Sequence, residues 1–349
     1  MGSNPFAGVK VEYHILQSFP VTCLNRDDVG APKSAIVGGV QRARVSSQCW
    51  KRQVRLSLHE MGVKLAVRTK KVNELVNEAC LAAGATEEQA TACSEKIGKL
   101  LSNDTLFFFT HREAAAYAEV AKSHGFDLSG VSDKPFEKEI RTASKAALDP
   151  NLEGLDIALF GRMVAQDSSM DIQAAASFAH AISTHKVSNE LEFFTALDDL
   201  EGDKGAAHMG SLEYNSATYY RYVSLDLGQL YTSLHGEDIS SAVAAFTKAL
   251  FLAVPAARQA TQSGASTWDY ARVYVRRGQR LQVSCDAPVK QRGEGFVKPS
   301  VDYINTYLDE KESMFGSLFG KISTHTIGNG SGYSIDNLVS DLATDIAGI

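Results

Sequence analysis

The chain has 349 residues, of which 44% are hydrophobic and 22% charged, and its formal net charge is −6. These values exclude a wholly disordered or fibrous protein, and the length suits two domains or one large domain with insertions. No apolar run approaches the roughly 20 residues of a membrane span, and the first residues lack the pattern of a secretory signal. The five cysteines form no CxxC pair, which is typical of a cytoplasmic protein without a zinc or disulfide framework.

Charge is distributed unevenly along the chain. Residues 40–55 contain five basic residues and no acidic one, and 268–298 contain seven basic and three acidic residues. Residues 301–349 are acidic. Because a nucleic-acid site needs only a local basic patch, the two basic segments are candidates for such a site in spite of the negative net charge.

The N-terminal part is predicted to form strands and one helix. Apolar and polar residues alternate over 9–17, which is typical of a half-buried strand, and a polar loop follows. A Gly38-Gly39 turn then separates two further extended segments. Ser46 and Ser47 favour the start of a helix over 49–61, which Gly62 would end.

Residues 70–148 are predicted to be helical, with a capping box at Thr110 and Glu113 and one strand-like island, TLFFFT. Residues 188–215 are expected to be irregular. The later helices are expected at 239–253, 300–315 and 335–347, and the later extended segments at 155–160, 178–187, 216–227 and 268–285. Strands and helices that interleave without regular alternation predict an α+β fold. Its antiparallel sheet would be of the ferredoxin-like or RNA-recognition-motif kind, carrying long insertions.

The segment GGVQRARVSSQCWKRQVR has the chemistry of a polyphosphate-binding surface. Gly39, like Gly38, would allow another chain to approach closely. Ser46, Ser47 and Gln48 offer donors at a helix N-terminus, where the helix dipole favours an anion. The basic side chains of the next turns are Lys51, Arg52 and Arg55. An ordinary N-cap followed by a solvated basic face is an equally good interpretation of these residues.

The segment CLNRDD is a second candidate site. Arg26 could bind phosphate, and Asp27 and Asp28 could act as catalytic carboxylates or as a metal pair. An Asx-turn in a loop is the commoner role of such a segment, and we favour it on the residues alone.

Phe193 and Phe194 are adjacent aromatic residues in a polar stretch that we expect to be a loop. Such a pair can wedge or stack against bases, although a place in the core is the usual role of phenylalanine. His180 and His185 would face opposite sides of a strand and so would not share a metal. The sequence has no phosphate-binding loop, dinucleotide fingerprint or zinc-protease motif, and we expect no cofactor and no metal.

Several blocks of the chain together resemble a known family. The blocks are CLNRDD, the Gly-Gly turn, RVSSQCWKR, DIALFGRM, AHAISTHKV, FFTALDDL, GAAHMG and YYRYVSLDLGQL, in this order. They are similar to the CasC family, also called Cas-seven, the backbone subunit of the type I-E CRISPR Cascade complex. The resemblance covers about residues 9–260 and fades within 65–150 and beyond 265.

The resemblance implies a non-enzymatic, cytoplasmic RNA-binding protein that forms a helical filament on a guide RNA (crRNA) in antiviral defence. Copies of the chain would grip the RNA backbone, kink it at regular intervals and present its bases to target DNA. The residues that match the family's backbone grip are Arg26, Lys33, Ser46, Gln48, Lys51 and Arg52. Arg162 and Met163 match the block beside the thumb, and Phe193, Phe194 and Thr195 match the thumb and its aromatic wedge. Here the wedge begins Phe-Phe where the family pattern has Trp-Phe, which keeps stacking but changes its reach.

The resemblance also implies a right-hand architecture and a set of partners. The expected parts are a palm (1–62, 151–187 and 215–300), a helical fingers insertion (63–150), a thumb (188–214) and C-terminal helices (301–349). The implied protein partners are further copies of the chain, the large, small, Cas-five-type and crRNA-processing subunits of Cascade, and a helicase-nuclease or another attached nuclease.

Two other functions stay open on the sequence. Backbone subunits of type III complexes are more distantly similar and cut target RNA with a loop aspartate, so Asp27 or Asp28 would make this chain an RNA endonuclease. A general RNA-binding protein outside CRISPR systems is also compatible with the chemistry, but it does not explain the order of the blocks.

Overall fold

The long first strand, β1 (Val9–Thr22), has both faces buried. Tyr13 on one face and Glu12 and His14 on the other are each at most 1% exposed. The expected half-buried strand is therefore corrected, because helices cover both sides of the sheet. The strand also runs through residues 18–22, which had been expected to belong to a loop.

The computed structural model describes residues 4–101, 106–149, 153–164, 168–197, 206–291, 293, 295–328, 330 and 332–349. Contacts divide the chain into two compact units. The sheet unit comprises Gly8–Ser57, Ser177–Leu225 and Val243–Ile349. The helical unit comprises Leu58–Ala176, Asp226–Ala242 and the N-terminal residues to Ala7. Among the described residues, no helix combines the length and apolar character that a bilayer span requires.

The main sheet has the order β11–β10–β1–β9–β7–β3–β2, and its described pairings are antiparallel. Its other strands are β2 (Ser34–Val37), β3 (Val40–Val45), β7 (Ala181–Ser183), β9 (Ala206–Asp226), β10 (Tyr270–Arg277) and β11 (Lys321–Gly328). Two further strands, β6 (Ala176–Phe178) and β8 (Glu190–Leu197), pair with β9. The expected α+β class with an antiparallel sheet is confirmed.

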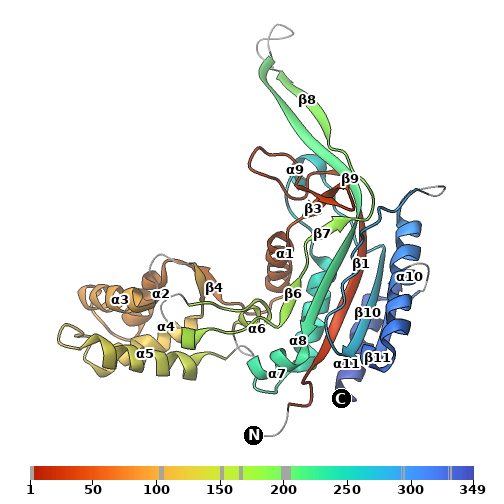
Figure 1. Cartoon of the computed structure of the whole chain (residues 1–349). Coiled ribbons are helices and arrows are strands. Elements are labelled where there is room, and N and C mark those ends of the chain that lie inside the picture. Colours follow the sequence, from red (N-terminus) through yellow and green to blue (C-terminus); the bar gives the residue numbers. More distant parts are fainter. Residues whose placement is uncertain are drawn as a thin grey trace. The chain divides into compact units, whose positions relative to one another are not determined.

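Helices of the sheet unit pack on the two faces of β1 (Figure 1). On one face, the Tyr13 hydroxyl is hydrogen-bonded at 2.7 Å to the Thr247 hydroxyl of α8 (Ile239–Leu252). On the other face, buried tyrosines of β9 and β10 cluster with Ile304 of α10 (Val297–Phe315). At the sheet edge, Asp345 of α11 (Ile335–Ala347) accepts hydrogen bonds from Ser323 and His325 of β11.

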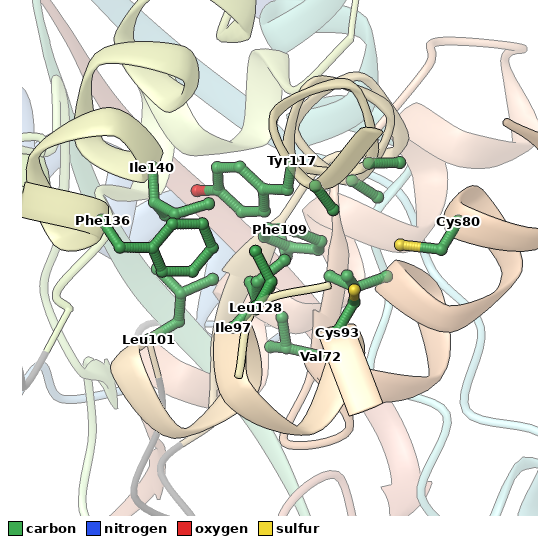
Figure 2. Packing of buried hydrophobic residues seen from close by; sticks show 14 of the residues in the cluster. Val72, Cys80, Cys93, Ile97, Leu101, Phe109, Tyr117, Leu128, Phe136 and Ile140 are labelled. Carbon is green, nitrogen blue, oxygen red and sulfur yellow. The ribbon is translucent and has the colours of Figure 1, made fainter. Parts of the chain in front are cut away.

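The helical unit is built around one apolar cluster, shown in Figure 2. It draws its residues from α2 (Val72–Ala82), α3 (Glu87–Leu101), α4 (His111–Ser123), α5 (Asp133–Ala147) and the strand β5 (Phe107–Phe109). The strand β4 (Val67–Thr69) pairs with β5. The predicted capping box is confirmed, since Thr110 and Glu113 exchange hydrogen bonds at the start of α4.

Three expectations of local structure are wrong. Residues 155–160 form the helix α6 (Leu155–Phe160) rather than a strand; five of its six residues are buried, so the sequence shows no periodicity that separates the two. In the segment 188–215, which was expected to be irregular, Glu190–Leu197 of β8 pairs with 206–214 of β9. The extended segment 178–187 is broken into the ends of β6 and β7.

A few short elements complete the chain. In the helical unit they are η1 (Ser168–Met170) and α7 (Leu227–Ser233), and in the sheet unit α9 (Gln259–Gln262) and η3 (Gly316–Phe319). β11 and α7 were not predicted from the sequence. β2, β3, α8, α10 and α11 lie at the predicted places to within a few residues, whereas β10 ends at Arg277 and the predicted extended segment continued to residue 285.

Candidate nucleic-acid interface

The helix α1 (Ser47–Glu60) begins at a well-bonded cap. The Ser46 hydroxyl accepts the Cys49 N–H at 3.3 Å, and the Ser46 N–H donates to Asn25 Oδ1 at 2.9 Å. The Ser47 N–H donates to the Nδ1 atom of His180 at 3.2 Å. The cap thus joins α1 to the loop after β1 and to the segment between β6 and β7.

The start of α1 carries no negative side chain. Its first turn has no acidic residue, and Lys51 and Arg52 lie in the second turn. No side chain of the first turn therefore offsets the positive end of the helix dipole, and two cations follow it. This arrangement suits the binding of an anion.

Five cations share this surface, which we call the basic surface: Arg26, Lys33, Arg44, Lys51 and Arg52. Burial and then the charges of Arg44 and Lys33 lower the pKa of His180, and Arg52 and Lys33 counteract the burial that raises the pKa of the Cys49 thiol. Lys33 and Arg44 thus lie near His180, and Arg52 and Lys33 lie near Cys49, while Arg26 and Arg52 line one pocket. Within the described part of the chain, no ion pair involves any of the five side chains.

Lys51 is the most constrained of these cations. Its ammonium lies 5.8 Å from the centre of the Phe178 ring, and burial lowers its pKa. Arg26 and Arg52 are exposed, whereas Lys33, Arg44 and Arg55 are half-buried. The half-buried Lys51 and the exposed Arg26 and Arg52 offer phosphate donors at different depths of this surface.

The loop after β1 is shaped by Asp27. One carboxylate oxygen of Asp27 accepts hydrogen bonds from the N–H groups of Val29 and Ala31 at 3.0 and 2.9 Å. The backbones of Arg26 and Pro32 form an isolated antiparallel β-bridge. This is the Asx-type turn that the sequence analysis favoured. Beside it, a pocket of about 510 Å³ is lined by Asn25, Arg26, Asp28, Arg52, Gln53 and Ala256, among others.

The glycines of the β2–β3 turn have separate roles. Both have positive φ angles, 59° at Gly38 and 74° at Gly39, as this two-residue turn requires. A β-carbon on Gly38 would lie 1.8 Å from the Asp286 carbonyl oxygen, whereas one on Gly39 would meet nothing within 4 Å. The close backbone approach is therefore made at Gly38, and Gly39 stays on the exposed side of the turn.

The hairpin of β8 and β9 separates the two phenylalanines. Phe193 pairs with Ser211, Phe194 with Gly210 and Thr195 with Met209, so Phe193 and Thr195 share one face and Phe194 lies on the other. Exposed apolar side chains gather on the first face: Leu191 (69%), Phe193 (65%) and Met209 (62%). The expectation of two aromatics on a loop is corrected, because both lie on β8. The acidic flanks Asp198 and Asp199 fall outside the described residues.

Arg162 and Met163 belong to the helical unit. The Arg162 guanidinium is buried, pairs with Glu113 at 2.8 Å and donates to the Met170 carbonyl at 3.1 Å. Met163 is 70% exposed. The side chain of Arg162 thus stabilises the helical unit, and its charge is already neutralised.

Comparison with known proteins gives the family. The sequence pattern of CT1975-like proteins matches residues 11–333. The chain belongs to the CT1975-like protein family. No curated protein matches it.

Two solved structures share the fold of this CT1975-like chain. A chain of a structure described as "CRISPR RNA-guided surveillance complex, pre-nicking" is 23% identical, with a TM-score of 0.81 over 96% of this chain and 99% of that one. A chain of a "CRISPR RNA-guided surveillance complex" is 21% identical, with a TM-score of 0.61 over 97% and 99%.

The family match corrects the resemblance drawn from the sequence. That resemblance named the CasC family of type I-E complexes and faded within 65–150 and beyond 265. The matching pattern is that of CT1975-like proteins, and it extends across both of those regions. We therefore replace the CasC assignment by the CT1975-like family.

Sequence reasoning did not select three residues that the CT1975-like chain places at this surface. Arg44 lies near Lys33, His180 bonds the cap of α1, and Gln53 lines the pocket. Only the basic run around Arg44 gave a signal in the sequence, because the other two depend on contacts between distant segments.

Proposed function

We propose that this CT1975-like protein is an RNA-binding backbone subunit of a CRISPR RNA-guided surveillance complex. Several copies bind side by side along one crRNA and hold its sugar-phosphate backbone, leaving bases free to pair with target DNA. Other subunits of the complex and a separate nuclease complete the assembly. The division into palm, fingers and thumb that the resemblance implied is part of this proposal.

The observation that carries the proposal is the basic surface on α1 and its neighbouring loops. Its five cations have no acidic partner among the described residues, and Lys51 and Arg52 follow a helix start without acidic side chains. Such a surface favours the binding of a polyanion. The fold shared with chains of RNA-guided surveillance complexes supports crRNA as that polyanion.

The proposed RNA contacts of the sheet unit are made by the basic surface, the start of α1, the β2–β3 turn and one face of the hairpin. They comprise Arg26, Lys33, Gly39, Ser46, Ser47, Gln48, Lys51, Arg52, Arg55, Phe193 and Thr195. A separate contact is proposed for the exposed Met163 of the helical unit. We leave out the side chain of Arg162, because Glu113 already pairs with its buried guanidinium. Phe194 is assigned to the opposite face of the hairpin.

The protein is proposed to be non-catalytic. Of the two loop aspartates that an RNA endonuclease could use, Asp27 has its carboxylate bonded to two backbone N–H groups of its own turn. This role favours loop formation over the type III-like cleavage of RNA.

Co-expression with a repeat-spacer array tests the proposal. The wild-type chain should purify with RNA of uniform length in an assembly far larger than the 37.7 kDa monomer. Lys51→Ala/Arg52→Ala should lower the RNA content, and each lost phosphate contact should reduce the salt slope of binding by about 0.7. The matched control is Lys134→Ala/Lys138→Ala, which removes two exposed charges from α5. The proposal would be refuted if the wild type purified as an RNA-free monomer that does not bind added guide RNA. It would also be refuted if both double variants carried the same amount of RNA.

A further inference from the structure

The pocket beside Asp27 contains a polar side chain that the proposed phosphate grip does not use. Gln53 of α1 is only 8% exposed and lines the pocket. Its side-chain amide makes no hydrogen bond to any described residue. Although the residue as a whole is mostly buried, its amide is open to the pocket and can bond a polar group that enters it.

The other lining groups define the chemistry of that ligand. Arg26 and Arg52 bring two positive charges to the pocket, and Asp27 and Asp28 bring two carboxylates, of which Asp27 is bonded to its own turn. The carboxylates would repel a bare phosphate, whereas a ligand that joins an anion to a hydroxyl group can bond both the arginines and Asp28. The apolar lining of Leu24, Ala256 and Ala257 suits the carbon face of a sugar. Since no aromatic side chain is among the described lining residues, the pocket offers a base nothing to stack on.

We infer that this pocket binds a ribose-phosphate unit of the RNA, with Gln53 hydrogen-bonded to the ribose 2′-hydroxyl and Arg26 and Arg52 on the adjoining phosphate. An amide can both donate to and accept from a hydroxyl, and the 2′-hydroxyl is the group that distinguishes RNA from DNA. Gln53 is then the residue that sets the preference of the basic surface for RNA. The inference rests on the proposed function.

The test compares the affinity of the full chain for a labelled single-stranded RNA and for DNA of the same sequence. The wild type should prefer the RNA, and Gln53→Leu should reduce RNA affinity by about 3- to 10-fold, as expected for one hydrogen bond, while DNA affinity stays unchanged. Arg52→Ala is the matched control and should weaken RNA and DNA equally. If Gln53→Leu does not fold, Gln53→Ala takes its place.

The possible results distinguish a failure of the proposed function from a failure of the role proposed for the pocket. A wild-type chain that binds neither nucleic acid refutes the proposed function. A wild type that binds RNA through Lys51 and Arg52 but binds DNA equally well refutes only the role of the pocket. An RNA preference that persists unchanged in the Gln53 variant also refutes the role of Gln53.

Discussion

The ring of Phe194 on β8 covers Gly210 on β9, its direct partner in the hairpin. A β-carbon on Gly210 would lie 2.7 Å from the ζ-carbon of the ring. The ring of Phe194 can therefore pack here only because Gly210 has no side chain. Phe193, one residue earlier, faces the other way and is exposed.

The first prediction distinguishes these two phenylalanines. Phe193→Ala should fold with an unchanged melting temperature and load guide RNA, but the assembled complex should bind complementary DNA more weakly. Loss of one stacked base costs roughly 1–3 kcal/mol. Phe194→Ala and Gly210→Ala should instead lower the melting temperature and leave DNA affinity nearly unchanged. A reversed pattern, with DNA binding sensitive only to Phe194, would assign the stacking role to the wrong face.

The second prediction concerns the buried pair of Arg162 and Glu113 in the helical unit. Removing one partner leaves a charge buried alone, so Arg162→Met should lower the free energy of unfolding by about 3–5 kcal/mol. The double variant Glu113→Gln/Arg162→Met should recover part of that loss, because it leaves no uncompensated charge. Urea unfolding of the full chain measures both effects. If Arg162→Met kept its stability and lost RNA affinity, Arg162 would contact the RNA after all.

The third prediction concerns pH and His14. Burial, and then the charges of Arg272 and Arg276, lower the pKa of His14 from 6.5 to about 3. Between these two values the unfolded chain binds a proton that the folded chain does not, so stability should fall as the pH falls through this window. The contribution of one such group reaches about 1.4 kcal/mol per pH unit.

His14→Phe isolates this contribution from that of the carboxyl groups. The variant keeps an aromatic ring beside Tyr220 and Tyr222 but cannot be protonated. Its unfolding free energy should decline less steeply from pH 6.5 to pH 4 than that of the wild type. Equal slopes for the two proteins would show that folding does not lower the pKa of His14.

The fourth prediction concerns the aspartates of the loop after β1. Asp27→Asn/Asp28→Asn should leave guide loading and destruction of a DNA target by the partner nuclease intact, because the asparagine oxygen can still accept the Val29 and Ala31 N–H groups. Asp27→Ala should lower the free energy of unfolding by about 1 kcal/mol, because those two hydrogen bonds are lost. Incubation of the assembled complex with labelled complementary RNA provides the check. Cleavage by the wild type that the asparagine variant lacks would support the RNA endonuclease.

Sequence periodicity predicted those elements whose two sides differ in environment. The helix after Ser46, the capping box at Thr110 and Glu113 and the strand of Tyr270–Arg277 fall where their patterns placed them. Leu155–Phe160 is a helix where a strand was expected, because five of its six residues are apolar and one polar residue, Asp156, is too little to show a helical period. The hairpin of β8 and β9 was missed for the opposite reason, since both of its faces carry polar residues.

The basic surface was predictable in part. Its lysines and arginines lie within short segments of sequence, so their types and spacing gave a signal. The contribution of His180 and the place of Gln53 depend on how the loop after β1 and the segment after β6 meet α1. Spacing along one chain does not encode such contacts, nor does it show that Glu113 neutralises Arg162 from another helix.

The pairing of β8 with β9 also restricts how the hairpin that these two strands form can change length in evolution. An unmatched residue inserted between Glu190 and Phe193 would turn Phe193 toward the face now held by Phe194, and would move Phe194 off Gly210. Insertions that preserve both faces must come as two residues in each strand, or lie beyond Thr195 and Met209. Homologues of different hairpin length are thus expected to differ at the far end of the hairpin, with the spacing from Glu190 to Thr195 unchanged.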